Sequence, residues 1–349
     1  MKFFVDYSAL RKGKIKNLIP ILKFHWLGLD KQAIFSGRTN PDSRIELTED
    51  PREANFVLLP MHWSYYLWND KENFTDAEAA AELAARFNKN VVVWYQGDLV
   101  PKVPFDNAIV FLPGIVGNET EQLRACPVFI DDPSEDFGRR SEIYRSWKET
   151  PEIGFCGFSA SGPVKQCFSV VQGLRLSLLS SLGYYDYDNV PVIPSTVLRT
   201  RVLRRLEESE LVDTNFIKRS RYTPKTVTDS GNPGEMRTAF FDNLYGSDYS
   251  VCVRGYGNWS YRFYETLACG RIPIFINTDC VLPLSSSIDW KKYCVWIERS
   301  EIDEIVERIL DFHSSFDEEG FIALQVELRK IWEEQFTLGG MMANLESYL

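Results

Sequence analysis

The stretch 248–290 limits what this chain of 349 residues can fold into more than any other part does. It contains two apolar runs typical of buried strands, at 250–254 and 272–276. Between these runs the pattern predicts a helix that begins at Ser260 and ends at Gly270. A strand, a helix and a strand of this length form a βαβ unit, which predicts two parallel strands joined by a right-handed connection.

The turn that opens this helix suits an anion, because backbone N–H groups at a helix start point toward the carboxyl end of the preceding strand. Gly255 and Gly257 let the backbone approach a ligand, although turn formation explains them equally well. Gly255-x-Gly257-x-x-Ser260, followed by Asp279, also approximates a dinucleotide-binding fingerprint whose third glycine is missing. The residues alone therefore leave a phosphate site and a dinucleotide site open.

Charged side chains flank this turn. Arg254 leaves the strand end directly at the turn, where a guanidinium group can hold phosphate with two parallel hydrogen bonds. Arg262 and Glu265 are three residues apart and share a helix face, so they are either a diphosphate contact and a ribose contact or an ordinary surface ion pair. Arg219 ends another short predicted strand and is a further phosphate candidate.

Strands and helices alternate along the rest of the chain, which predicts an α/β protein with mostly parallel sheets. Its length favours two domains, and the polar stretch 131–152 predicts the linker between them. Further strands are expected at 3–6, 55–60, 91–95, 108–112, 128–130, 153–158 and 215–219, and further helices at 75–88, 164–182, 196–209, 236–245 and 318–335. The arginines between residues 199 and 205 are expected on a solvated helix face.

The overall charge and the cysteines exclude several classes of partner. A net charge of −10 argues against binding to nucleic acid or to an anionic membrane. The seven cysteines are scattered and form no CxxC pair, which predicts buried reduced thiols rather than disulfides or a zinc site. Asp186-x-Asp188 imitates a metal-binding pair, but it lies in a tyrosine-rich loop, and no metal site is expected.

The chain shows no signal peptide and no run approaching the roughly 20 apolar residues of a membrane span. We therefore expect no transmembrane segment and a cytoplasmic location.

Several blocks, in this order and spacing, resemble the signature of exostosin-family glycosyltransferases. They are Cys-Val-Arg-Gly-Tyr-Gly-Asn at 252–258, Ser-Tyr-Arg-Phe-Tyr-Glu at 260–265, Gly-Arg-Ile-Pro at 270–273, Asp-Cys-Val-Leu-Pro at 279–283 and Ile-Asp-Trp at 288–290. Residues 51–60, 96–98 and 153–157 are similar to weaker blocks of that family, so the likeness spans most of the chain.

The resemblance implies a GT-B fold: two Rossmann-like domains with parallel sheets facing across a cleft. Residues 1–145, joined by a C-terminal helix at about 325–349, would bind the acceptor, and residues 146–324 would bind a nucleotide-sugar donor. The donor-binding residues carried over are Arg219, Arg254, Gly255, Gly257, Asn258, Ser260, Arg262 and Glu265. Lacking a membrane anchor and a second glycosyltransferase domain, the chain is expected to act on a polysaccharide, a lipid-linked glycan or a glycoprotein.

The resemblance also implies an inverting single displacement that uses no metal and no cofactor. It would move a hexosyl or pentosyl group from a nucleoside-diphosphate sugar, with UDP as the first expectation, to a hydroxyl of a glycan or polysaccharide. Such a displacement needs a base on the acceptor domain, and His62 and Asp98 both follow predicted strands there. An NAD(P)-dependent oxidoreductase and a catalytically inactive sugar-binding module are the alternatives.

Overall fold

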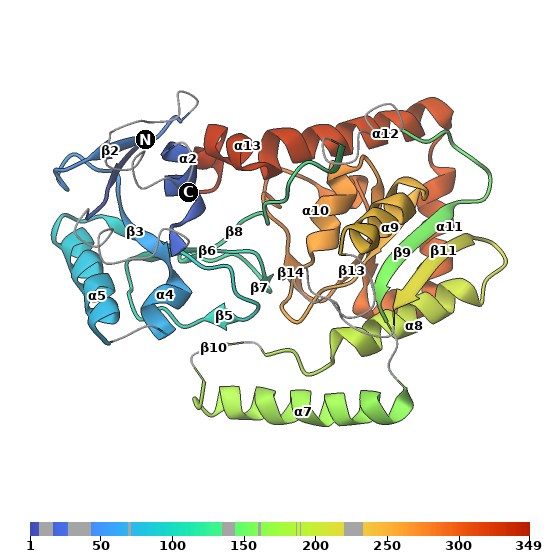
Figure 1. Cartoon of the computed structure of the whole chain (residues 1–349), viewed down its shortest axis with the longest axis horizontal. Helices are drawn as coiled ribbons and strands as arrows, with labels where there is room; N and C mark the ends of the chain where they lie inside the picture. The colour runs from blue at the N-terminus through green and yellow to red at the C-terminus, as the bar shows by residue number, and fades with distance from the viewer. Residues whose placement is uncertain are drawn as a thin grey trace. The chain divides into compact units, whose positions relative to one another are not determined.

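A computed structural model describes residues 1–6, 17–26, 43–68, 71–134, 144–159, 162–185, 187–188, 190–219 and 233–349 (Figure 1). Contacts between Cα atoms divide the chain into two compact units. The first unit holds residues 1–127, 281–284 and 334–349, and the second holds 128–280 and 285–333.

The first unit ends at residue 127, earlier than the expected boundary at residue 145. The C-terminal segment re-enters this unit at residue 334, later than the expected residue 325. Two ion pairs hold the expected linker on the second unit. Asp132 pairs with Arg329 at 2.5 Å, and Arg145 pairs with Asp248 at 2.5 Å. Residues that looked like a solvated linker by composition are therefore part of the second unit.

The first unit contains a six-stranded sheet with the order β2-β1-β3-β4-β6-β8, and its strand pairs are parallel. Its strands are β1 (Lys2–Phe4), β2 (Glu46–Thr48), β3 (Phe56–His62), β4 (Asn90–Trp94), β6 (Ala108–Leu112) and β8 (Leu123–Ala125), with the two-residue strands β5 (Val100–Pro101) and β7 (Ile115–Val116). Its helices are α2 (Pro20–His25), α4 (Trp63–Trp68), α5 (Lys71–Arg86) and α13 (Leu338–Ala343), and the short 3₁₀ helix η6 covers Leu345–Ser347.

The second unit contains a five-stranded parallel sheet with the order β11-β9-β12-β13-β15. Its strands are β9 (Glu152–Phe158), β11 (Asp213–Arg219), β12 (Tyr249–Cys252), β13 (Ile272–Asn277) and β15 (Val295–Glu298), with the two-residue strands β10 (Tyr187–Asp188) and β14 (Cys280–Val281, at the unit boundary). Its helices are α7 (Pro163–Ser181), α8 (Ser195–Glu207), α9 (Pro233–Tyr245), α10 (Tyr261–Ala268), α11 (Ile305–Ser314) and α12 (Glu318–Ile331). Shorter helical turns are η3 (Trp290–Lys292), η4 (Arg299–Glu304) and the π-helical η5 (Trp332–Phe336).

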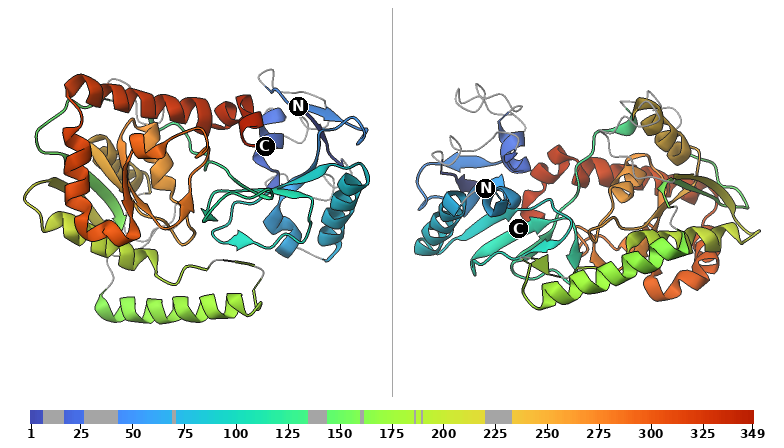
Figure 2. Two further views of the ribbon diagram at one scale, coloured as in Figure 1. Left: turned by 180° about the vertical axis from the view of Figure 1, so that it is seen from behind. Right: turned by 60° about the horizontal axis from the view of Figure 1, so that its bottom comes forward.

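The order of this second sheet positions its ligand site. Numbered along the chain, its strands run 2-1-3-4-5, so the direction of winding reverses between β9 and β12. Helix α8 packs with α11, and α10 packs with α12 (Figures 1 and 2). In open sheets of this kind, ligands bind beyond the carboxyl ends of the strands at the point of reversal. The ends of β9 and β12 are therefore the place to look for a site.

The βαβ unit expected from the sequence is confirmed. Strands β12 and β13 are parallel, with Tyr249 opposite Ile272, and α10 connects them. Gly270 has a φ of 60°, a left-handed conformation that glycine adopts without strain, and it ends the helix as expected. The strand expected at 128–130 is wrong, because those residues pair with no strand of the described chain. They lie between Pro127 and Pro133, and proline lacks the N–H that a sheet needs.

Two doubly wound units, each with its own parallel sheet, confirm the predicted fold class of two Rossmann-like domains. The cleft between the domains stays a prediction. Among the residues described, no helix is both long enough and apolar enough to cross a membrane.

Candidate functional site

Arg262 lies where the winding of the second sheet reverses. Its Nη2 donates to the carbonyl oxygen of Cys156 at the end of β9 at 2.5 Å, and its Nη1 donates to the carbonyl of Val251 in β12 at 3.3 Å. The guanidinium group lies over the Phe155 ring, 4.2 Å from its centroid. Burial lowers the pKa of this guanidinium group. Arg262 therefore bridges the two strands between which a ligand is expected.

Gly157 makes room for this arginine. A Cβ atom at Gly157 would lie 2.8 Å from Nη2 of Arg262, closer than non-bonded atoms approach. Sequence alone does not show that this position must be glycine, because Arg262 is far from it along the chain. The requirement becomes visible only when β9 and α10 are placed together.

Arg254 is a buried cation at the end of β12, with 7% of its surface exposed. Its Nη1 donates to the carbonyl oxygens of Gly255 and Tyr256 at 3.1 and 3.3 Å, and its Nη2 donates to the carbonyl of Ile193. Burial lowers its pKa to about 10, and the nearby cation of Arg299 adds to the effect. Its acceptors are neutral carbonyls, and no carboxylate in the described part of the chain pairs with it.

Two more arginines reach the same edge of the sheet. Arg199, on α8, donates to the carbonyl of Phe158 at 2.6 Å and to that of Arg254 at 3.2 Å. Arg219, at the end of β11, donates to the carbonyl of Met236 at 2.9 Å. Together with Arg254 and Arg262 they line the carboxyl edge of the sheet from β11 to β12.

The expectation of a solvated face holds for Arg201 and Arg205, which pair with Asp303 at the surface, but it is wrong for Arg199. Residues two apart on a helix point to nearly opposite sides, about 200° apart. Arg199 and Arg201 therefore belong to different faces of α8. The two-residue spacing of Arg199 and Arg201 could have shown that they face different sides, but treating 199–205 as one basic run hides that difference.

Glu265 is buried, and it does not form the ion pair with Arg262 that was one interpretation of their spacing. Its Oε1 accepts from Nη1 of Arg237, on α9, at 2.6 Å, and 6% of the residue is exposed. The guanidinium group of Arg237 also lies over the Phe241 ring, 4.3 Å from its centroid. The surface ion pair is therefore excluded, and Glu265 is a fixed carboxylate beside the arginine-lined edge.

The turn before α10 is held by its own backbone and by the side chains of Arg254 and Asn258. The N–H of Gly255 donates to the carbonyl of Trp259 at 2.8 Å, and Oδ1 of Asn258 accepts from the Thr278 hydroxyl at 2.6 Å. Gly255 and Gly257 both lie outside the positive-φ region, so neither is needed for a left-handed turn. Ser260 occupies the N-cap position as expected, but its side chain makes no capping hydrogen bond. Its hydroxyl stays available to a ligand at the start of the helix.

His62 and Asp98 follow neighbouring strands of the first sheet. His62 ends β3 opposite Trp94 in β4, and Asp98 follows β4 in an exposed turn, so both belong to one edge. Nδ1 of His62 is buried and makes no hydrogen bond with any described residue. Burial, helped by the charge of Lys23, lowers the pKa of His62 to about 4. The histidine is therefore neutral at physiological pH and is a weaker base than an exposed imidazole.

The cysteines are confirmed as free thiols, and six of them are buried. Cys167 is exposed on α7, so the expectation that the thiols are buried is wrong there. The described residues contain no group of three or more His, Cys, Asp or Glu side chains that could hold a metal ion. Of the Asp186-x-Asp188 pair, Asp186 lies outside the described residues.

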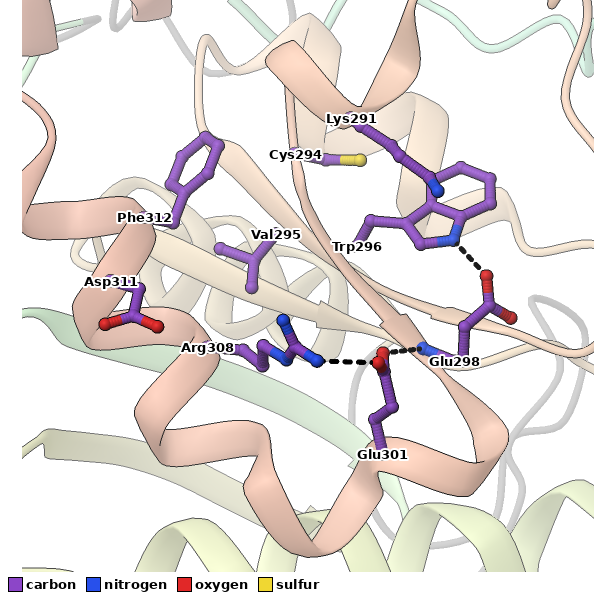
Figure 3. Close-up of a pocket in the computed structure, with 9 residues that line it drawn as sticks. All are labelled: Lys291, Cys294, Val295, Trp296, Glu298, Glu301, Arg308, Asp311 and Phe312. Atoms are coloured by element: carbon purple, nitrogen blue, oxygen red, sulfur yellow. Dashed lines mark hydrogen bonds and ion pairs between the residues drawn. The ribbon is translucent and has the colours of Figure 1, made fainter.

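A pocket of about 340 Å³ lies beside the edge strand β15, against α11 (Figure 3). Several of its polar groups bind one another. Arg308 pairs with Glu301 at 2.7 Å, and Glu298 accepts from the indole N–H of Trp296 at 2.7 Å. None of the expected donor-binding residues lines it. A second pocket, of about 250 Å³, lies in the first unit between α5 and the strands β1 and β3, with Asp6 on its wall.

The second unit is thus a doubly wound α/β domain, a class in which ligands bind at the carboxyl edge of the sheet. Comparison with known proteins identifies it further. Residues 195–311 match the exostosin GT47 domain. Over these residues the chain is similar to the exostosin family of glycosyltransferases.

Two relatives show what share of a family member's length this chain matches. The chain is 31% identical to exostosin-1 of Drosophila melanogaster over 93 residues, which are 27% of this chain and 12% of that protein. It is 30% identical to the probable glucuronosyltransferase 47 A of Physcomitrium patens over 76 residues, 22% of this chain and 17% of that protein. The match therefore spans less than a fifth of either relative.

Solved structures add only a weak likeness. A glycosyltransferase from Rickettsia africae ESF-5 aligns with a TM-score of 0.37 at 14% identity, covering 99% of this chain and 97% of that one. An α,α-trehalose-phosphate synthase (UDP-forming) from Burkholderia vietnamiensis aligns with a TM-score of 0.37 at 10% identity, covering 98% and 85%. Scores this low carry no argument about the site.

Proposed function

We propose that this chain transfers a sugar from a nucleoside-diphosphate sugar to a hydroxyl of a glycan or polysaccharide, by an inverting single displacement without a metal. The observation that supports this most is the set of cations at the reversal point of the second sheet. Among the described residues, Arg219, Arg254 and Arg262 donate to backbone carbonyls and to no carboxylate. Arg254 is buried, and a buried cation held by neutral carbonyls is costly, so an arriving diphosphate would be stabilised strongly there.

Each group then has a role that its position supports. Arg254 and Arg262 would contact the diphosphate and stabilise the charge that develops on it as the sugar leaves. The Ser260 hydroxyl and the N–H groups at the start of α10 would add neutral donors. Glu265, held by Arg237, would accept hydrogen bonds from ribose hydroxyls. UDP remains the first expectation for the nucleotide, and the name of the moss relative makes a hexuronic acid the first sugar to test.

A thermal-shift screen with UDP-sugars, GDP-sugars and nicotinamide dinucleotides tests this proposal. A ligand at 100 times its Kd stabilises the folded state by about 2.7 kcal/mol, so the true donor raises Tm clearly. Release of nucleoside diphosphate in the presence of glycan acceptors is the second measurement. A shift with nicotinamide dinucleotides alone means an oxidoreductase. Donor binding that no acceptor converts into nucleotide release means a sugar-binding module.

For the base that takes the acceptor proton, the proposal favours Asp98 over His62, because burial weakens the imidazole as a base. We expect Asp98→Asn to lower kcat by about 100-fold or more and His62→Gln by much less, as positioned bases contribute about 10²–10⁴. With a pKa of about 4, His62 does not gain a proton between pH 7 and pH 5. The pH profile of kcat/KM should therefore show no histidine inflection near pH 6.5. An inflection there that disappears in His62→Gln would instead assign the base to His62.

A further inference from the structure

Helix α7 presents a stripe of large apolar side chains to solvent. Phe168, Val171, Leu174, Leu178 and Leu182 are 64, 62, 52, 60 and 63% exposed, with Leu182 directly after the last helical residue. Their spacing of three and four residues places them on one side of the helix over four turns. Single exposed leucines are ordinary, but an apolar stripe of this length marks an interaction surface.

The opposite side of α7 carries Gly173 and Ser180 together with the half-buried Leu176, and it packs on the chain that follows. A Cβ atom at Gly173 would lie 2.3 Å from the carbonyl oxygen of Val192, so the backbone of 191–192 lies directly against the helix. The Ser180 hydroxyl, which is buried, donates to the carbonyl of Tyr187. A surface helix normally buries its large apolar residues, whereas α7 half-buries Val170, Leu176 and Leu179 and leaves the larger apolar set exposed. What covers the stripe must therefore be apolar.

The size of the stripe argues against a second copy of the chain. A helix of 19 residues is about 28 Å long and, at a width of about 10 Å, presents about 300 Å². A stable protein interface buries about 800 Å² on each partner. The stripe is too small to hold two proteins together, but it matches the apolar face of a helix that lies along a membrane surface.

The charge of the segment around α7 also favours a membrane surface. Residues 153–185 contain no aspartate or glutamate, and their two charged residues are Lys165 and Arg175, although the whole chain has a net charge of −10. Tyr184 and Tyr185 follow the helix and are 73 and 39% exposed. Tyrosine is enriched at the boundary between water and lipid, and basic residues are attracted to anionic head groups.

We propose that α7 docks this protein on an anionic phospholipid bilayer, lying along the surface with its apolar stripe among the acyl chains. The helix does not span the bilayer. The expectation that net charge excludes an anionic membrane is thereby reversed for this helix, because α7 itself carries no acidic residue and Glu152, Asp186 and Asp188 lie outside it. An anionic surface is the one that a membrane presents to the cytoplasm, the location expected from the sequence.

Co-sedimentation with vesicles tests this proposal on the full chain. One set of vesicles is phosphatidylcholine alone, and in the other a third of the lipid is phosphatidylglycerol. The stripe variant is Leu174→Glu with Leu178→Glu. The matched control is Leu211→Glu with Val326→Glu, two apolar residues of other elements that are 62 and 40% exposed. A third variant, Arg175→Glu, changes only the charge beside the stripe.

We expect the unmodified chain and the control to bind the anionic vesicles, and the stripe variant to bind at least about tenfold more weakly. Arg175→Glu should weaken binding to anionic vesicles by about tenfold, because each basic residue near the surface contributes and the new glutamate is repelled. Circular dichroism establishes that the variants fold. Failure of the unmodified chain to bind, or equal weakening in the control, overturns the proposal. So does a dimer in sedimentation velocity without lipid that the stripe variant converts to a monomer.

Discussion

Arg262→Ala is expected to lower kcat/KM for sugar transfer by about 100-fold or more while the chain stays folded. The guanidinium group lies at the reversal point between β9 and β12, and it would donate to a diphosphate whose charge grows as the sugar departs. Removing one preorganised donor to a developing charge costs about 10²–10³ in rate in other enzymes. Because 100-fold corresponds to about 2.7 kcal/mol, the loss is easily separated from the scatter of an assay. Steady-state release of nucleoside diphosphate measures it.

The same arginine also holds two strand-end carbonyls, so its variants must separate a lost contact from a loosened sheet. Arg262→Lys keeps the charge but loses the forked geometry, and it should recover only part of the activity. Gly157→Val leaves Arg262 in place but pushes its guanidinium group aside, and it should lower activity as well. Arg205→Ala removes a surface cation that pairs with Asp303 and serves as the control. A merely structural role would lower Tm and activity together in the alanine variant.

Glu265→Ala is the partner experiment, because the carboxylate is assigned to the ribose and not to the phosphates. It should weaken donor binding in calorimetry more than it slows turnover at saturating donor, since ribose contacts are the same before and during the reaction. Full activity in both Arg262→Ala and Glu265→Ala would falsify the assignment of this edge as the donor site.

The βαβ unit could be predicted from sequence because every signal for it is local. The apolar run before Gly255, the N-cap position of Ser260 and the glycine at 270 lie within one short stretch. The site itself could be predicted only in part. Arg254 and Arg262 stood out because they flank the turn, whereas Arg199 did not, because its carbonyl partners on β9 and β12 are distant in the sequence.

Side-chain pairs between different helices and strands could not be predicted for the same reason, because their members are distant in the sequence. The carboxylate of Glu265 could be paired from sequence only with a neighbour on its own helix, and its partner, Arg237, comes from α9. The helix at 164–182 was predicted nearly at its observed bounds, but periodicity cannot say which side faces solvent. Its inverted orientation, with the apolar side outward, depends on the segment that packs behind Gly173.

Arg271 shows how a residue of the family signature can serve the fold instead of the ligand. It is fully buried at the start of β13. Its Nη1 donates to the carbonyls of Cys269 and Gly270 at 3.2 Å each and to Oε1 of Gln325 at 3.3 Å, and its Nη2 donates to the carbonyl of Tyr245 at 2.9 Å. One guanidinium group thus ties the ends of α9 and α10 to α12. Burial lowers its pKa to about 10, which leaves it charged at neutral pH.

Arg271→Ala is therefore expected to lower the free energy of unfolding by about 3–5 kcal/mol, because it leaves buried acceptors without a donor and opens a cavity. Urea denaturation measures this, and Arg204→Ala, which removes a surface pair with Glu208, should change it by no more than about 0.5 kcal/mol. At low temperature, where the variant is still folded, its KM for the donor should match that of the unmodified chain. The two arginines lie in one short stretch, but their variants should behave differently. Arg262→Ala should lose activity and keep its stability, whereas Arg271→Ala should lose stability and keep its donor site. A loss below about 1 kcal/mol in Arg271→Ala, or a raised KM without any loss of stability, would contradict this separation.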